Sequence, residues 1–224
     1  MGINYLRISA VLTKELKSEF RTRYAISAVL LFVLTTITMI MFATAGETIT
    51  PMIAAGILWV IMFFASMTGL SKVFVSEEER GTYILLQLSS TPYAIYFGKL
   101  LFNVLLSASL NFFAVVLFFL FLGDIEVKNL TLFISTIAIG SLSVASATTI
   151  ISALIAKANS KNALFPVLSF PILLPIIILG VGLTKMSFEG IAFEDAMKDL
   201  QMMVAYSGLM IVASYFLFDF VNKD

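Results

Sequence analysis

The chain has 224 residues, of which 60% are hydrophobic and 12% are charged, and its mean hydropathy is +1.02. Because a soluble domain carries about 25% charged residues, this composition predicts a membrane protein. Fourteen basic residues balance fourteen acidic ones, which gives no sign of nucleic-acid binding, and the absence of Cys and His excludes disulfides, thiolate catalysis, Cys/His zinc sites and Ser-His-Asp triads within this chain.

Residues 1–24 show the pattern of an amphipathic helix on a membrane surface. At about 100° per residue, apolar side chains gather on one face and basic side chains on the opposite face. The apolar face holds Tyr5, Ile8, Leu12, Leu16 and Phe20, and the basic face holds Arg7, Lys14, Lys17 and Arg21. Only Glu19 falls on the wrong side. We therefore predict an interfacial helix, with an ordinary cytoplasmic extension as the alternative.

Six apolar runs are long enough to cross a membrane, because a helix needs about 20 residues to span a hydrocarbon core of roughly 30 Å. They cover residues 25–45, 51–70, 100–122, 130–156, 163–183 and 202–218, and none contains Asp, Glu, Lys or Arg. The sequence thus predicts an all-α, polytopic membrane protein with six transmembrane helices in a single domain over residues 1–224.

Lys and Arg are divided unequally between the two sides of the predicted bundle. One side holds only Lys128, Lys185 and Lys198, and the other eleven lie in the N-terminal segment, residues 71–99, the loop after the fourth span and the C-terminal end. Cytoplasmic loops carry the excess of positive charge. We therefore expect both termini and residues 71–99 to be cytoplasmic.

Residues 71–99, between the second and third spans, are predicted to form a compact helical projection. Its first helix should end at Gly81, a natural stop, and a short helix should run from Thr82, as its cap, to about residue 88. Ser90 or Thr91 would cap the next helix, with Pro92 in its first turn. Such a rigid arrangement transmits force, whereas a slack loop would not.

The projection combines a cluster of acidic residues before its turn with an apolar tip. Glu77, Glu78 and Glu79 precede its turn, while Leu85 and Leu88 share one face of the short helix. Such a surface fits a cleft on a soluble partner. The alternative is a loop helix that lies on the protein's own surface with its glutamates in water.

The fourth span carries small residues at steps of four, namely Ser141, Ala145, Thr149 and Ala153. Stripes of small residues let membrane helices approach closely. We interpret this stripe as a packing surface rather than a substrate site, and as a candidate for contacts between two copies of the chain.

The fifth span contains Pro166, Pro171 and Pro175, three of the five prolines in the chain. Each removes a backbone donor, which lipid tolerates only where neighbouring helices or a wet cavity satisfy the freed carbonyls. We predict a bent or broken helix beside the substrate path, with a static kink that aids packing as the alternative.

A short external helix is predicted between the fifth and sixth spans. Phe193, Met197 and Leu200 share a face there, and Glu194 and Lys198 form an i,i+4 pair. A solvated loop helix explains this pattern at least as well as a gate does.

The sequence contains no source of energy of its own. The spans hold no ionisable Asp, Glu, Lys or Arg side chain, so coupling to an ion gradient is poorly supported. The twelve glycines include no G-x-x-x-x-G-K-[ST] loop, and Gly98-Lys99 lacks the earlier glycine. Energy, if it is used, must arrive from a partner.

The projection resembles the cytoplasmic coupling region of ABC-2 type transporter permeases. The matching residues are Glu78-Glu79-Arg80-Gly81-Thr82, then Leu85-Leu86, Pro92 and Gly98-Lys99. Those permeases commonly have an acidic residue soon after the Gly-Thr pair, where this chain has Ile84, so one contact to the ATPase is missing or shifted.

A more discriminating resemblance covers nearly the whole chain. Residues 154–180, a short basic loop followed by a proline-punctuated span, and residues 56–74 are similar to the heme exporter permease of the cytochrome c maturation system, the CcmB family. The length and the six spans also agree with this family.

The resemblance implies an ABC-2 type permease fold whose projection docks on a separate ATP-hydrolysing subunit. The residues expected to carry this coupling are Glu77, Glu78, Glu79, Arg80, Gly81, Thr82, Leu85, Leu86, Leu88 and Pro92. It also implies a complex in the cell inner membrane that exports or delivers heme in c-type cytochrome biogenesis. Two permease chains would assemble there with two ATPase chains, a heme-handling membrane protein and a periplasmic heme chaperone.

We expect no cofactor or metal to be bound by this chain itself. ATP would bind the partner subunit, and heme would be the cargo of the complex. The usual axial ligands of heme iron are His, Cys, Met and Tyr, and this chain lacks the first two. Heme is therefore expected to be ligated elsewhere.

Two other functions remain open at this point. The chain could be an ABC-2 type permease for another cargo, such as a lipid, a glycan or a drug, or a membrane scaffold without transport. A membrane-embedded enzyme is the weakest alternative, because the spans contain no cluster of acid, base or metal ligands.

Overall fold

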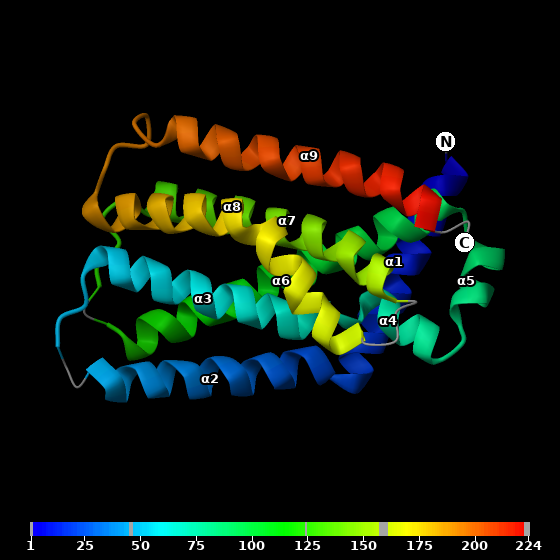
Figure 1. Cartoon of the computed structure of the whole chain (residues 1–224), viewed down its shortest axis with the longest axis horizontal. Helices are drawn as coiled ribbons and strands as arrows, with labels where there is room; N and C mark the ends of the chain where they lie inside the picture. Colours follow the sequence, from blue (N-terminus) through cyan, green and yellow to red (C-terminus); the bar gives the residue numbers. More distant parts are fainter. Residues whose placement is uncertain (1, 45–46, 124, 157–160, 222–224) are drawn as a thin grey trace.

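The computed structural model describes residues 2–44, 47–123, 125–156 and 161–221. Within them the chain is all helical, without strands (Figure 1). The helices are α1 (Gly2–Thr22), α2 (Tyr24–Thr44), α3 (Pro51–Leu70), α4 (Lys72–Glu79), α5 (Tyr83–Ser89), α6 (Pro92–Phe121), α7 (Leu130–Ile155), α8 (Lys161–Glu189) and α9 (Met197–Val221). Among the described residues, six helical stretches are long and apolar enough to span a membrane. The predicted all-α fold with six spans is confirmed.

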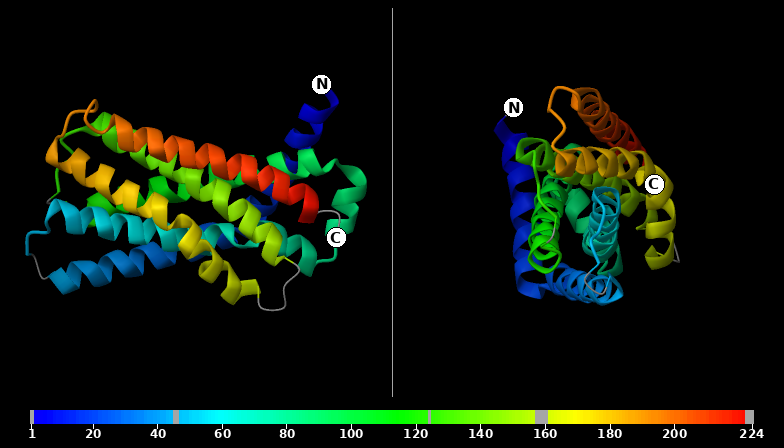
Figure 2. Two further views of the ribbon diagram at one scale, coloured as in Figure 1. Left: turned by 45° about the horizontal axis from the view of Figure 1, so that its top comes forward. Right: turned by 90° about the vertical axis from the view of Figure 1, so that its left-hand side faces the viewer.

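The six spans run along one long axis, while α1 crosses the end of the bundle at a steep angle (Figures 1 and 2). The central helix is α7, which packs against α3, α4, α6, α8 and α9. The N-terminus, α5 and the C-terminal end of α9 lie at one end of the molecule (Figure 1). The projection and both ends of the chain therefore share one side of the predicted membrane.

Trp59 joins three helices in the half of the bundle away from α1. Its side chain is 1% exposed, and its indole Nε1 donates a hydrogen bond to Thr184 Oγ1 of α8 at 2.9 Å. A Cβ at Gly180 would lie 2.0 Å from the indole ring, and one at Gly140 of α7 would lie 2.5 Å from it. Because Gly140 and Gly180 lack side chains, the indole ring of Trp59 can pack directly against α7 and α8.

The polar side chains of α7 pair with neighbouring helices of the same chain. Asn103 of α6 donates to Thr149 Oγ1 at 2.8 Å, and Asn111 donates to Ser141 Oγ at 2.9 Å. The whole small-residue stripe, from Ser141 to Ala153, is buried. The packing interpretation is confirmed, and the suggested contact of this stripe with a second copy is wrong, because the stripe is covered inside the chain.

The proline-containing helix α8 is bent but continuous. It runs as one helix from Lys161 to Glu189 with all three prolines inside it, and its direction changes along its yellow part in Figures 1 and 2. The prolines face outwards. Close to the bend, the Tyr206 hydroxyl of α9 donates to the carbonyl of Ile172, three residues before Pro175. A side chain of a neighbouring helix thus bonds to a backbone carbonyl near a proline, as expected for a proline-containing helix in a membrane. The position of this helix beside a substrate path stays a prediction.

The short external helix predicted between the fifth and sixth spans is wrong. Helix α8 ends at Glu189, and Gly190 follows with a φ of +81°, a conformation that favours glycine. Residues 193–196 form turns, and Met197 is the first residue of α9. The apolar spacing read as a separate helix belongs to this turn and to the first turns of α9, where Leu200 is buried.

Candidate functional site

The α4–α5 projection, residues 72–89, continues α3 beyond the membrane-spanning part of the bundle. Ser71 joins α3 to α4 in a helical conformation, with φ −62° and ψ −27°. Helix α4 ends at Glu79, Arg80 is its C-cap residue, and Gly81 follows with a φ of +66°. The stop predicted at Gly81 is confirmed, because the left-handed conformation there suits glycine.

Thr82 does not cap α5 with its side chain, contrary to the prediction. Its backbone is helical instead of extended, and its hydroxyl donates to Glu77 Oε2 at 2.7 Å. The Thr82 hydroxyl is thus directed towards the buried carboxylate of Glu77 and makes no hydrogen bond with the N–H groups at the start of α5. By contrast, Thr91 caps α6 by accepting from the Ala94 N–H at 3.3 Å, and Pro92 occupies the first turn as predicted.

Helix α5 carries three large apolar side chains in water. Ile84, Leu85 and Leu88 are 65%, 66% and 81% exposed, whereas Leu86 is only 8% exposed and packs inwards. The apolar tip therefore includes Ile84, whereas Leu86 faces the interior of the chain and its role in coupling stays a prediction. Exposed apolar clusters at such a position mark interaction sites.

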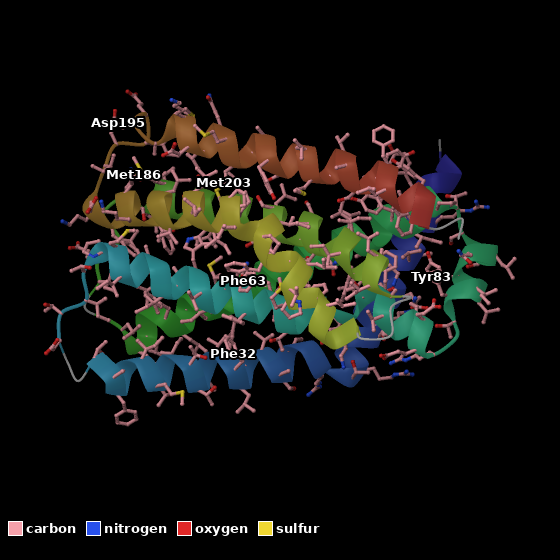
Figure 3. All side chains as sticks on the ribbon, in the orientation of Figure 1. Phe32, Phe63, Tyr83, Met186, Asp195 and Met203 are labelled. Carbon is pink, nitrogen blue, oxygen red and sulfur yellow. The ribbon has the colours of Figure 1, made fainter. Side chains whose placement is uncertain are left out.

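The rest of the projection is arranged asymmetrically around this tip. Glu79, Arg80 and Gly81 are exposed, Glu78 is partly buried, and Glu77 is buried. Tyr83, the first residue of α5, lies at this end of the molecule (Figure 3). Burial and the nearby Glu78 raise the pKa of Tyr83 to about 12, although a bond with Gln87 opposes them. Its hydroxyl therefore stays protonated. Because Glu77 is buried and Glu78 is partly buried, the three glutamates expose less charge than the sequence suggested.

A charge network of Lys14, Glu15, Glu77 and Lys99 lies beneath the projection. Lys99 Nζ of α6 is 2.7 Å from Glu15 Oε1 of α1 and donates to the carbonyl of Val73 of α4 at 2.5 Å. Lys14 of α1 is 3.1 Å from Glu15 Oε1 and also bonds to Glu77 of α4. The network therefore ties the surface helix to the projection and to the third span.

This network is shielded from water far more than a surface ion pair is. Lys99 is fully buried, Glu15 is 7% exposed and Glu77 is 8% exposed. The Lys99 ammonium also lies 4.7 Å from the centroid of the Phe74 ring, a favourable cation–π geometry. Burial alone would lower the pKa of Lys14, but Glu15 and Glu77 outweigh it, so this pKa lies above its ordinary value. The Lys14 ammonium therefore stays charged.

Gly98 lets α1 come close enough to α6 to form these pairs. A Cβ on Gly98 would lie 2.7 Å from Val11 Cβ and 3.1 Å from the carbonyl oxygen of Ile8. Val11 is 3% exposed and lies one turn before Glu15. Gly98 and Lys99 thus hold α1 against α6, which we call the seating of α1. The glycine allows the two helices to approach closely, and the lysine forms the ion pair with Glu15.

Gly98→Ala is expected to loosen α1, because overpacking at this backbone contact costs about 1–3 kcal/mol. The chain has no cysteine, so Ile8→Cys supplies a single thiol at a half-buried position of α1 whose backbone lies beside Gly98. Its labelling by a water-soluble maleimide should become roughly fivefold faster or more, as a cost of about 1 kcal/mol implies. Gly56→Ala is the control, because no atom lies within 4 Å of that added Cβ. Equal labelling rates in the two variants would contradict the seating role.

Helix α1 uses a different side for the bundle than its apolar stripe. Val11 and Glu15 face α6, roughly a quarter of a turn round the helix from the stripe, while Tyr5 and Phe20 of the stripe are each 67% exposed. Leu12 and Leu16 of the stripe are partly buried against the core, so only part of the stripe is exposed, and its contact with a membrane surface stays a prediction. Glu19, the exception in the sequence pattern, accepts from the Ile26 N–H of α2 at 3.4 Å and so joins α1 to the first span.

Sequence reasoning missed Glu15 and Lys99, the most buried members of the network. Charged residues are ordinarily assigned to water, and only the partner helix shows that these two face each other. One signal was present, because Lys99 begins a series of polar residues at steps of four along α6, continued by Asn103, Ser107 and Asn111. All four are fully buried. The described residues hold no group of three or more acidic side chains that could bind a metal ion.

A comparison with known proteins identifies the family of the chain. A family model described as CcmB protein matches residues 6–220, nearly the whole chain, from α1 through the projection to α9. A search of curated proteins found no match. The chain therefore belongs to the CcmB family, the permease component of ABC-type heme exporters in cytochrome c biogenesis.

Proposed function

We propose that this chain is a permease subunit driven by ATP hydrolysis in a separate cytoplasmic subunit, and that the α4–α5 projection is where that subunit docks. The observation that carries this proposal is the exposure of Ile84, Leu85 and Leu88 on a short helix at the end shared by both termini. The unequal division of Lys and Arg supports a cytoplasmic position for that end.

The projection is rigidly connected to three elements that could respond to a push on α5. Helix α4 continues α3 through Ser71, and α5 leads through two extended residues to the capped start of α6. The charge network adds α1 as the third element. A docked ATPase would thus move the second and third spans together with the surface helix.

The cargo proposed for the complex is heme, exported or delivered for c-type cytochrome assembly in the inner membrane. Membership of the CcmB family supports this cargo over a lipid, glycan or drug. The absence of His and Cys supports a mechanical role for this chain, with heme held by a partner membrane protein and passed to a periplasmic chaperone. Two copies of the chain would form the complete permease.

Leu85→Asp is expected to abolish co-purification of the ATPase with the tagged chain in mild detergent. A buried apolar anchor at an interface contributes at least about 2 kcal/mol, which weakens binding roughly 30-fold when it is lost. The side chain is 66% exposed, so the fold itself should tolerate the change. The measurement is the ATPase recovered per tagged chain.

Ala192→Asp is the matched control, because it puts the same charge on an exposed residue at the opposite end, near Asp195 (Figure 3). It should retain the ATPase fully. Retention by Leu85→Asp at the level of this control would overturn the docking role of α5. A heme-binding membrane protein among the recovered partners would favour heme over other cargo.

A further inference from the structure

Two cavities meet beneath α1, and their characters differ. The first, of about 320 Å³, lies between α1, α2 and α6 and is lined almost entirely by apolar side chains such as Leu30, Leu105 and Phe113. The second, of about 330 Å³, lies between α1, α4 and α6 and is lined by charged and hydroxyl groups together with apolar side chains such as Val73 and Phe102. Glu19, Phe102 and Leu106 line both cavities, so together they form one amphipathic space.

The polar cavity contains charges of both signs. Lys72 and Arg80 are its cations, and Glu19 and Glu79 stand with Glu15 as its anions. Hydroxyl groups from α1 and α4 complete its wall. Glu15 is already paired with Lys14 and Lys99, so a purely anionic ligand would meet the carboxylates of Glu19 and Glu79, and a purely cationic one would meet the two basic groups. The lining therefore complements a ligand that carries a negative and a positive charge side by side.

The depth of the apolar cavity matches one leaflet of a membrane. It follows α6 from Phe102 to Phe113, which is about 16 Å at 1.5 Å per residue and about half of a hydrocarbon core of roughly 30 Å. The polar cavity lies at the shallow end, beside α4 and the surface helix α1. This order, polar at the interface and apolar towards the centre, is that of a lipid in its leaflet.

We infer that this space binds a zwitterionic phospholipid of the phosphoethanolamine class. One acyl chain lies along α6 beneath α1, the phosphate meets Lys72 and Arg80, and the ammonium donates to the carboxylates of Glu19 and Glu79. Because Glu15 belongs both to the polar cavity and to the charge network, the bound headgroup lies against the seat of α1. The inference is independent of the ATPase partner and of the cargo.

The test is native mass spectrometry of the purified full chain in detergent, with phosphatidylethanolamine, phosphatidylglycerol or phosphatidylcholine of identical acyl chains added in turn. Phosphatidylglycerol lacks the cation, and the quaternary ammonium of phosphatidylcholine cannot donate a hydrogen bond. We expect phosphatidylethanolamine to be retained most tightly. Leu105→Trp should weaken its retention roughly tenfold, the factor for about two methylene groups left unburied.

Phe112→Trp is the matched control, because Phe112 lies on the same helix, is 69% exposed and does not line the apolar cavity. It should retain the lipid like the unchanged chain. Equal retention of the three lipids would overturn the headgroup assignment, and equal retention by the two tryptophan variants would overturn the cavity as the site. Retention of added hemin in preference to every lipid, lost in Leu105→Trp, would also overturn the proposal in favour of a cargo site.

Discussion

Lys99→Met is expected to destabilise the protein by about 3–5 kcal/mol, because it removes one partner of a buried ion pair and leaves the other charge without compensation. Glu15, which is 7% exposed, would keep only Lys14 at 3.1 Å. The carbonyl of Val73 would lose its donor as well. Since Lys14 is itself 42% exposed and partly screened by water, it cannot replace the fully buried ammonium.

The effect should reach the function through the position of α1. The Lys99 ammonium bonds to α1 and to α4 at once, so its loss disconnects the surface helix from the α4–α5 projection. We expect trypsin to cleave faster after Arg21, in the last turn of α1, and after Arg23, which follows that helix. The thermal unfolding midpoint should also fall. ATPase docking on the exposed face of α5 should persist, which would separate a loss of transmission from a loss of binding.

A double-mutant cycle measures the coupling free energy between Glu15 and Lys99 directly. Glu15→Gln and Lys99→Met should each be costly, while the double variant should cost less than the sum, with a coupling free energy above about 1 kcal/mol. Lys185→Met is the control. It breaks an i,i+4 pair with Glu189 at 3.5 Å whose side chains are 40% and 37% exposed, and it should cost less than about 0.5 kcal/mol. If Lys99→Met were as mild as this control, the network would have no structural role.

The spans and the turns of the projection were predictable because each depends on short stretches of sequence. A run of about 20 apolar residues suffices for a membrane helix, and the stop at Gly81 and the start at Pro92 follow from backbone chemistry. The external helix was predicted wrongly for a related reason. The Glu194 and Lys198 spacing fits any helical turn, and nothing local showed that α9 begins only at Met197.

The candidate site was harder to predict because its main contacts join distant parts of the chain. Residues 15 and 99 form a buried pair that no local period reveals, and Gly98 is needed only because α1 crosses α6 there. The orientation of α5 was ambiguous for another reason. Leu85, Leu86 and Leu88 are equally apolar, so only the packed structure shows that Leu86 faces inwards while the others face water.

Trp59→Ala is the second change expected to have a large effect, at about 3–5 kcal/mol of destabilisation. The indole is 1% exposed and fills the space left by Gly140 and Gly180, so its removal leaves a cavity between three helices that cannot collapse without moving backbone. Thr184 Oγ1 also loses the N–H from which it accepts. Val60→Ala is the control, because Val60 is the next residue of α3 and is 50% exposed.

Gly180→Ala tests the same contact from the opposite helix. Its Cβ would lie 2.0 Å from the rigid, buried ring, so α8 must move away from α3, at a cost of about 1–3 kcal/mol or more. Combining it with Trp59→Phe, which shortens the ring system, should recover part of that loss. Since Trp59 is the single tryptophan, its fluorescence emission in Gly180→Ala should shift to longer wavelength as the ring becomes exposed. The emission could instead stay unchanged, and the free-energy costs of Gly180→Ala and Trp59→Phe could simply add. The packing of α3 against α8 would then not depend on this contact, and other residues would have to hold together the half of the bundle away from α1.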